Sequence, residues 1–429
     1  MTSVGVVHLD LTSKGGGEAV ALNVLESLQA DYELTLLTAA EPDVPALNDY
    51  FNTRVDPSSL SVRLAGTLAP ALHDHYADGY YVLQNALLAR YVRRHADEFD
   101  LLVSTINELG LPRGSIEYVH FPFDWSVSLT NRGDIFHPTL DGDSVYERLC
   151  RRVAGVDRTA VQENSVFANS EWTESAFEDA YDVRPEVLYP PVDTTEFVER
   201  RWTDRENGFV VVGRIERSKR LSDIVEVIDG VRERGHDTHL HVVGPTYDEA
   251  YRAELDAMAA ARDHVFVEGE LPRSELVDLM CSHRYGVHGK ANEHFGMSVA
   301  ELVAAGAVTF VPESGGQCAI VHDDDRLTYR TFDEAAAKID RVLGDRSLQR
   351  ELRFGRSEIE RRFGRRRFRD RIAAAAAEAL GETREVTTRP ARRLSRIAAT
   401  DDLRSRGTVG PYRDRSKREN VRSQIIIEK

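Results

Sequence analysis

The chain has 429 residues and a formal net charge of −16, with 71 acidic and 55 basic side chains. This length suffices for two or three domains that each bury a core, and the acidic balance argues against a general nucleic-acid binder. The three cysteines lie far apart and form no C-x-x-C pair, so neither a disulfide framework nor a zinc site is expected. We expect no secretory signal, no membrane span and a cytoplasmic location, because no basic leader precedes the first apolar run and no apolar stretch approaches ~18 residues.

The charge is unevenly distributed along the chain. Residues 384–429 carry 13 basic and 6 acidic side chains, a net charge of +7, which leaves −23 on the remainder. Of the 55 basic residues, 49 are arginine and 6 are lysine. An acidic, lysine-poor chain fits a halophilic cytoplasm, where salt screens self-repulsion, and fits equally a GC-rich genome that favours arginine codons. The polar tail, residues 383–429, is predicted to be disordered.

Short β-rich runs alternate with amphipathic helical segments up to about residue 382, which predicts an α/β fold. Strands are predicted in the first half at residues 4–9, 33–38, 101–104, 116–120, 166–169 and 187–189. A Pro-Pro break at residues 190–191 stops regular structure. Strands are predicted in the second half at residues 209–213, 239–243, 265–268, 284–288 and 308–311. The pattern predicts two doubly wound, Rossmann-like domains whose ligands bind at the carboxyl ends of the strands.

Two polar motifs follow predicted strands in the first half. Gly15 and Gly16 lie in K-G-G-G-E, where backbone N–H groups at a helix start can approach an anion. The run matches neither the P-loop nor the dinucleotide pattern, and a plain strand-to-helix turn could use the same residues. His120 stands at the end of a strand in Y-V-H-F-P, where it can reach a ligand, although a lone histidine is more often structural.

Two further motifs follow strands of the second half. Arg214 and Lys219, in G-R-x4-K, suit a diphosphate, because a guanidinium binds it in a bidentate manner and an ammonium acts as a point charge. A solvated basic turn is the alternative. Glu293 and Glu301 flank the start of a predicted buried helix, where carboxylates are costly unless hydroxyl-rich groups such as a sugar and a ribose satisfy them. The alternative is one capping and one exposed glutamate.

These four motifs, in this order, resemble those of the retaining nucleotide-sugar glycosyltransferases of glycosyltransferase family 4, over about residues 1–380. S-G-G at 314–316 also matches that family. Within it, four runs are similar to the α-1,2-mannosyltransferases that extend dolichol-linked oligosaccharides: Y-V-H-F-P (118–122), N-S-E-W-T (169–173), L-Y-P-P-V-D (188–193) and E-H-F-G-M-S-V-A-E (293–301). Two departures are the lack of an N-terminal membrane anchor, which weakens the expectation of permanent membrane attachment, and Arg220 in place of a common glycine.

The resemblance implies the GT-B fold, in which two Rossmann-like domains face a central cleft. The expected segments are an N-terminal acceptor-side domain (1–195), a nucleotide-sugar-binding domain (196–364), a helix that returns to the first domain (365–382) and the basic tail (383–429).

The resemblance also implies roles for the donor-binding residues. Arg214 and Lys219 would neutralise the donor diphosphate, whose charge grows as the glycosidic bond breaks. Backbone N–H groups near Phe295 and Gly296, at a helix start, would assist.

The remaining site residues are assigned by the same resemblance. Glu293 would hold hydroxyls of the transferred sugar, and Glu301 those of the ribose. Gly16, with Gly15, would let the first domain close over the diphosphate, and His120 would contact the donor sugar beside the acceptor.

The function implied is retaining transfer of a hexose, with mannose as the first expectation, from GDP-mannose or a UDP-sugar to a lipid-linked or other glycan acceptor in N-glycosylation or surface-glycan assembly. Front-face attack, with the leaving phosphate taking the acceptor proton, would require no protein nucleophile, metal or other cofactor. The acidic clusters at 141–143 and 323–325 favour turns over metal sites. The alternatives are a nucleotide-sugar epimerase or hydrolase of the same fold, and a non-catalytic nucleotide-sugar-binding protein.

One helix candidate, residues 79–94, is aromatic and apolar with basic residues at one end. It could lie on an anionic membrane surface near a lipid-linked acceptor, with attraction from the basic tail, and so give peripheral membrane contact. An ordinary core helix of the first domain is the preferred interpretation.

Overall fold

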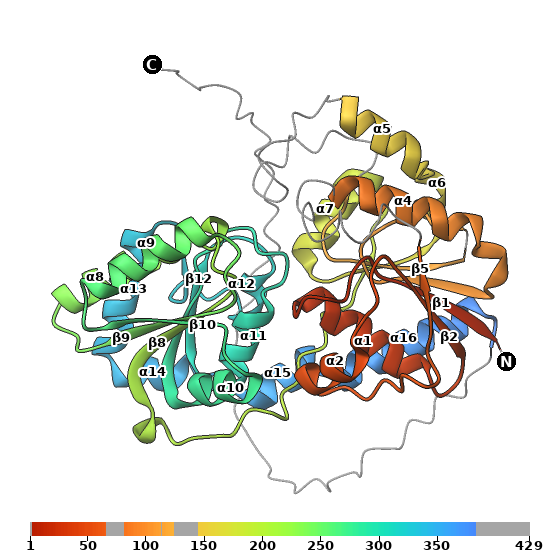
Figure 1. Cartoon of the computed structure of the whole chain (residues 1–429). Helices are drawn as coiled ribbons and strands as arrows, with labels where there is room; N and C mark the ends of the chain where they lie inside the picture. The colour runs from red at the N-terminus through yellow and green to blue at the C-terminus, as the bar shows by residue number, and fades with distance from the viewer. Residues whose placement is uncertain (1, 66–80, 113, 124–144, 383–429) are drawn as a thin grey trace, which may run out of the picture. The chain divides into compact units, whose positions relative to one another are not determined.

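The computed structural model describes residues 2–65, 81–112, 114–123 and 145–382 (Figure 1). The acidic cluster at 141–143, the start of the 79–94 segment and the basic tail from residue 383 lie outside the described residues.

The described part of the first half forms a seven-stranded parallel sheet in the order β3-β2-β1-β4-β5-β6-β7. Its strands are β1 (Ser3–Val7), β2 (Glu33–Thr38), β3 (Ser61–Leu64), β4 (Leu101–Ser104), β5 (Ile116–Val119), β6 (Ser165–Ala168) and β7 (Glu186–Val187). The helices of this half are α1 (Gly16–Leu28), α2 (Val44–Phe51), α4 (Tyr81–Arg94), α5 (Val145–Ala154), α6 (Arg158–Glu163) and α7 (Glu171–Tyr181).

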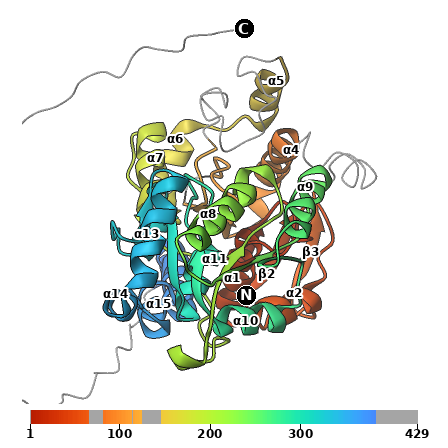
Figure 2. The same cartoon turned by 90° about the vertical axis from the view of Figure 1, so that its left-hand side faces the viewer.

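The described part of the second half forms a six-stranded parallel sheet in the order β10-β9-β8-β11-β12-β13. Its strands are β8 (Glu206–Val212), β9 (His239–Val243), β10 (Val265–Gly269), β11 (His283–Val287), β12 (Val308–Pro312) and β13 (Thr328–Tyr329). The helices are α8 (Leu221–Glu233), α9 (Glu249–Ala260), α10 (Arg273–Ser282), α11 (Met297–Ala304), α12 (Gln317–Ile320), α13 (Phe332–Gly344), α14 (Arg346–Glu351), α15 (Arg356–Phe363) and α16 (Arg365–Ala379). Helix α8 lies between α9 and α13 (Figure 2).

The central strands are apolar because helices cover both faces of each sheet. In β1, Val4 and Val6 share a core with residues of α1 and α16, whereas Val7 belongs to a second core that contains residues of α4 and α5. The alternation follows from the two-residue period of a strand, and burial on both faces accounts for the continuous apolar run.

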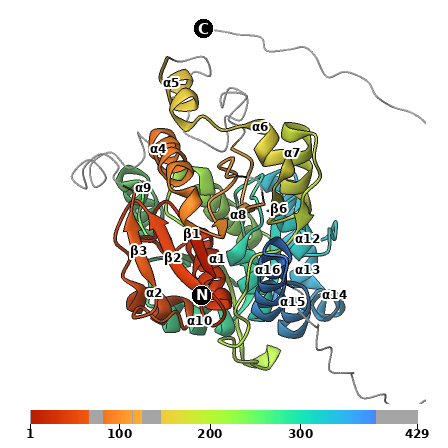
Figure 3. The ribbon, with the colours of Figure 1, turned by 90° about the vertical axis from the view of Figure 1, so that its right-hand side faces the viewer.

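The last helix, α16, returns to the first sheet and packs beside α1 (Figure 3). Its Phe368 and Ile372 are buried in the core of that sheet. Arg369 adds ionic hydrogen bonds of 2.7 Å to both carboxylate oxygens of Glu26 on α1. The α/β class, the two doubly wound sheets and the returning terminal helix are therefore confirmed.

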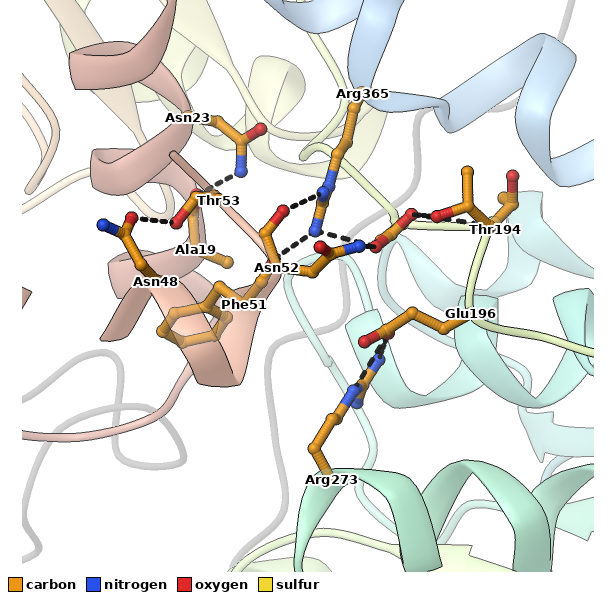
Figure 4. A network of polar contacts seen from close by, with 12 residues as sticks. Ala19, Asn23, Asn48, Phe51, Asn52, Thr53, Thr194, Glu196, Arg273 and Arg365 are labelled. Carbon is orange, nitrogen blue, oxygen red and sulfur yellow. Dashed lines mark hydrogen bonds and ion pairs between the residues drawn. The ribbon is translucent and has the colours of Figure 1, made fainter. Parts of the chain in front are cut away.

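The two connections between the sheets run together. The amide of Val192, in the Pro-Pro linker, donates to the carbonyl of Phe363 at 2.9 Å, just before α16 begins. Arg365 donates to the carbonyl of Asn52 at 2.7 Å and pairs with Asp193 at 3.0 Å, and the Asn52 amide also donates to Asp193 at 2.9 Å (Figure 4). This network joins the end of α2, the linker and the start of α16. The segment boundaries at 195, 364 and 382 stay predictions.

All eleven predicted strands are present within a few residues of their expected bounds. Two strands were missed, β3 and β13, and both lie at the edge of a sheet. Strand β3 reads SVRL and is largely exposed, and β13 has only two residues, so neither carries a strong apolar period.

Helix α4 is a core helix rather than a surface-lying one, as preferred from the sequence. Its Val82, Ala86 and Ala89 are buried in the core of the first sheet, and Arg90 and Arg94 are exposed. No helix in the described ranges is both long and apolar enough to cross a membrane.

Candidate functional site

The centre of the candidate site is an ion pair at the carboxyl edge of the second sheet. Lys219 follows β8 and Glu293 follows β11, and these two strands are neighbours in the sheet. The Lys219 Nζ lies 2.7 Å from Glu293 Oε2, and the two side chains are only 13% and 17% exposed. Strand adjacency therefore joins two residues that are 74 positions apart in the chain.

Glu293 is held ionised by its surroundings. Burial alone would raise its pKa, but the charges of Lys219 and Lys290 and a hydrogen bond from His288 keep the pKa well below the ordinary value. The His288 Nε2 lies 3.2 Å from Glu293 Oε2, and burial lowers the pKa of His288. Burial also lowers the pKa of Lys290. At neutral pH the site therefore holds a carboxylate that is satisfied by cations and an imidazole.

A glycine loop fixes the backbone of Glu293 from the other side. The Gly316 amide donates to the Glu293 carbonyl at 2.8 Å. Gly315 has φ +82°, and a Cβ there would lie 2.3 Å from that carbonyl oxygen. A Cβ at Gly316 would lie 2.2 Å from the His294 carbonyl oxygen. Positions 315 and 316 of the S-G-G run are therefore glycines because two backbones approach this closely.

Helix α11 begins directly after this segment. Gly296, its N-cap, has φ +101°, a conformation that other residues rarely adopt. The Phe295 side chain is buried against Tyr189 and Phe363, with ring centroids 5.8 and 5.3 Å away. Phe295 thus anchors the helix start in the core, and only its backbone is suited to the predicted binding role.

Arg214 has partners of its own on the loop that carries Lys219. Its guanidinium lies 3.2 Å from Glu216 and 5.1 Å from the centre of the Tyr247 ring, and its side chain is half-exposed. The stem of Lys219 lies over Gly213, the residue before Arg214, 3.5 Å from where a Cβ would be. The predicted diphosphate cations therefore lie on one loop, with Lys219 partly buried and Arg214 near solvent.

Glu301 is paired with Arg273, and Figure 4 shows the contact that Arg273 makes with Glu196. Arg273, at the start of α10, lies 2.7 Å from Glu301 Oε1 and 2.6 Å from Glu196 Oε2. Although burial opposes it, the two carboxylates raise the pKa of Arg273 above its ordinary value. The predicted ribose ligand is thus held by a partly buried arginine that was not predicted from the sequence.

A cavity of about 810 Å³ adjoins this pair. Residues from both halves of the chain line it, including Lys14 and Tyr50 from the first half and Glu196 and Arg273 from the second.

The glycine loop of the first sheet reaches the start of α11. A Cβ on Gly16 would lie 3.0 Å from Met297 Cγ. The amide of Gly15 donates to Glu18 Oε2 at 2.9 Å, so the carboxylate of Glu18 caps the start of α1. Gly16 therefore lies close to the start of α11, its role toward a diphosphate stays a prediction, and the N–H of Gly15 is already engaged.

At neutral pH His120 donates a hydrogen bond through Nε2 and can accept one through Nδ1. Its Nε2 lies 3.0 Å from the Thr105 carbonyl, which can only accept, so Nε2 carries the proton. Burial lowers the pKa of His120 to about 4, and the ring is therefore neutral with a lone pair on Nδ1. A Cβ on Gly17 would lie 3.8 Å from this ring, which places His120 beside the glycine loop.

His294 joins the two halves next to this point. Its ring stacks on Phe121 at 4.7 Å and on Trp172 at 5.8 Å, and its carbonyl accepts from Ser170 Oγ at 2.5 Å. Burial lowers the pKa of His294 to about 3. These contacts explain why E-H-F-G, Y-V-H-F-P and N-S-E-W-T occur together, since each run supplies one side of the same contact.

Four residues of the site were not predicted: His288, Lys290, His294 and Arg273. The position of His288 directly after β11 was a usable signal, and His294 lies inside a quoted motif. Arg273 carried no local signal, because it meets Glu301 only through tertiary packing. The acidic run at 323–325 lies in a turn in which Asp324 pairs with Arg326 at 2.6 Å.

Comparison with known proteins shows what this chain is similar to. Residues 192–357, which include Lys219, Glu293 and Glu301, match the family model described as glycosyl transferases group 1. This segment of the chain is therefore similar to the glycosyl transferases of group 1. A solved structure of Anabaena HepE in complex with UDP and glucose is similar, with a TM-score of 0.63 and 15% identity over 88% of this chain and 100% of that chain. At this identity the likeness shows the fold alone, and it confirms GT-B.

Two curated relatives carry the same name. Both are named GDP-Man:Man(3)GlcNAc(2)-PP-Dol alpha-1,2-mannosyltransferase. The Dictyostelium discoideum protein is 26% identical over 228 residues, which cover 47% of this chain and 45% of the relative. The Caenorhabditis elegans protein is 25% identical over 361 residues, which cover 73% and 76%. The chain thus spans less than half the length of the first of these relatives.

Proposed function

We propose that this protein is a retaining glycosyltransferase that moves a hexose, with mannose as the first candidate, from a nucleotide sugar to a lipid-linked glycan. The observation that carries the proposal is the buried Lys219–Glu293 pair beside the start of α11. The names of the two mannosyltransferase relatives support GDP-mannose as donor and a dolichol-type acceptor.

The ion pair suits a leaving diphosphate. A donor diphosphate gives Lys219 a second anion, and Arg214 on the same loop adds a second cation. Stabilisation of the charge that grows as the glycosidic bond breaks acts directly on the transition state. Glu293 stays ionised through His288 and Lys290, so it can accept hydrogen bonds from hydroxyls of the transferred sugar.

The other predicted ligands fit the same arrangement. Arg273 fixes the Glu301 carboxylate that would hold the ribose hydroxyls. His120 is neutral and accepts through Nδ1, which suits a sugar hydroxyl as donor. Gly16 would let the diphosphate lie between the start of α1 and the start of α11, which both contain a glycine.

Retention follows from front-face attack. The acceptor oxygen forms its bond to the anomeric carbon on the side that the diphosphate leaves, and the leaving phosphate oxygen takes the acceptor proton. The proposed step uses no protein nucleophile, metal or other cofactor. With a lipid-linked acceptor, the transfer reaction would take place at the cytoplasmic face of a membrane. The protein would reach this face by peripheral contact.

The test uses the full chain with GDP- and UDP-sugars and extracted lipid-linked glycans, and mass spectrometry reads both the mass added and the nucleotide released. We expect one hexose to be added and nucleoside diphosphate to be released only when the acceptor is present. Lys219→Met and Glu293→Gln should lose about 10²–10³-fold in rate. Lys338→Met is the matched control, because Lys338 is also a partly buried lysine paired with a glutamate, at 2.7 Å from Glu334.

Three results would overturn the proposal. Nucleotide release without acceptor would indicate an epimerase or hydrolase. Donor binding without turnover would indicate a binding protein. Wild-type rates in folded Lys219→Met would show that the assigned site is wrong.

A further inference from the structure

Three histidines meet at the amino end of the second sheet, on the edge opposite the Lys219–Glu293 pair. His239 and His241 lie on β9, and His283 begins β11. One ring nitrogen of each lies within 4.8 Å of those of the other two. Their side chains are partly or fully buried, and none of them belongs to the motifs assigned to the donor.

The sheet is built to let these rings meet. Strand β8 runs between β9 and β11, and its Gly208 pairs with His239. A Cβ on Gly208 would lie 2.3 Å from His239 Nε2. Any side chain at this position would therefore block the path that the His239 ring takes across β8 toward His283.

Two of the rings are oriented by groups outside the cluster. His283 Nδ1 donates to the Leu279 carbonyl at 2.8 Å, which leaves Nε2 with a lone pair. His241 Nδ1 donates to Glu268 Oε1 at 2.7 Å, and this also leaves Nε2 with a lone pair. Metal-binding histidines usually donate their second ring N–H to a carboxylate or a backbone carbonyl in this way, which fixes the tautomer and the ring.

The third ring completes the arrangement. His239 Nε2 lies 3.0 Å from His283 Nε2, so one proton is shared between two nitrogens that would otherwise both be acceptors. Glu206 Oε2 lies 3.6 Å from the first of these nitrogens and 3.9 Å from the second. A cation placed among them would replace the shared proton, which His239 can carry on Nδ1 instead, and would add a carboxylate ligand.

We propose that His239, His241 and His283 form a binding site for a divalent transition metal, Zn²⁺ first, with Glu206 as the fourth ligand. Imidazole and carboxylate are ligands that Zn²⁺ takes in tetrahedral sites, at about 2.0–2.2 Å, which places ligand atoms roughly 3.4 Å apart. The distances among the three ring nitrogens and the Glu206 carboxylate can reach that geometry through side-chain adjustment alone. The site would tie the starts of β8, β9 and β11 together and is independent of the proposed glycosyl transfer.

The test titrates the full chain with Zn²⁺ by calorimetry, after treatment with a chelator. We expect one Zn²⁺ per chain, loss of this binding in His241→Gln and His239→Gln, and a roughly 10–100-fold weaker affinity in Glu268→Gln, which removes only the orienting carboxylate. His264→Gln is the matched control: His264 lies just before β10 and is bonded to Asp229 at 2.8 Å, outside the cluster.

A spectroscopic readout covers the case in which a variant fails to fold. The wild-type chain with one equivalent of Co²⁺ should show the intense visible absorption of a tetrahedral site, and Zn²⁺ should remove it. Absence of stoichiometric Zn²⁺ binding, a weak octahedral Co²⁺ spectrum, or wild-type affinity in folded His241→Gln would each overturn the proposal.

Discussion

Removal of the Glu293 charge should separate nucleotide binding from sugar transfer. In the free protein Lys219 is engaged by Glu293 at 2.7 Å, so a diphosphate that uses Lys219 must compete with this carboxylate. Glu293→Gln keeps the shape of the side chain and removes the competitor. We therefore expect Glu293→Gln to bind a nucleoside diphosphate more tightly than the wild type, although it loses transfer.

The size of the effect follows from the geometry. Two unit charges 2.7 Å apart attract by about 6 kcal/mol at an effective dielectric constant of ~20, and desolvation offsets much of this. His288 and Lys290 stay beside position 293 in the variant. Only part of the attraction that is left after desolvation therefore becomes available to bind the nucleotide. We expect an affinity gain of about tenfold, equivalent to about 1.4 kcal/mol.

Calorimetric titration with GDP and with UDP measures this gain. Lys219→Met should bind the same nucleotide more weakly than the wild type, because the cation itself is lost. Glu313→Gln, which removes a carboxylate paired with Arg330 at 2.7 Å beyond the end of β12, is the control and should bind as the wild type does. Equal or weaker nucleotide binding in folded Glu293→Gln would refute the reasoning.

Three further substitutions test the stability of the fold. Burial raises the pKa of Glu117 to about 8 from an ordinary 4.5, so the folded state holds this proton more tightly and its stability falls as pH rises between these values, by up to about 5 kcal/mol. Glu117→Gln should therefore be the more stable protein above pH ~6 in urea unfolding, and an unchanged pH profile would contradict this. Gly316→Ala places a Cβ 2.2 Å from the His294 carbonyl oxygen and should lower the free energy of unfolding by about 1–3 kcal/mol, whereas a wild-type urea midpoint would show that the loop can move aside. Arg365→Met leaves Asp193 and the Asn52 carbonyl without this partner and should cost about 3 kcal/mol, which a thermal-unfolding loss below about 1 kcal/mol would contradict.

Much of the fold could be read from local patterns. The runs that became β2, β4 and β9 were predicted at their observed bounds, because strands buried on both faces are continuous apolar segments between polar turns. Strands β3 and β13 were missed because edge strands bury little and carry little apolar signal. Helix α4 was ambiguous, since an apolar, aromatic helix suits both a core and a membrane surface.

The site was predictable only as separate pieces. Lys219, Glu293 and Glu301 were each placed after a strand or on the following helix, which is where ligands of such folds bind. Their partners were not: Arg273 meets Glu301, and His288 meets Glu293, through contacts that no spacing in the chain encodes. The same holds for the histidine cluster, whose members His239 and His283 are 44 residues apart.

The sequence by itself determined the α/β class, the division into two sheets at the Pro-Pro linker, and the motifs that follow the strands, because these depend on local periodicity and on residues that stop regular structure. The tertiary structure alone decided that β8 and β11 are neighbours, and with that the meeting of Lys219 with Glu293, of Glu301 with Arg273, and of three histidines across Gly208. Strand order is set by pairing and burial between distant segments, and these contacts leave no periodic trace in the chain.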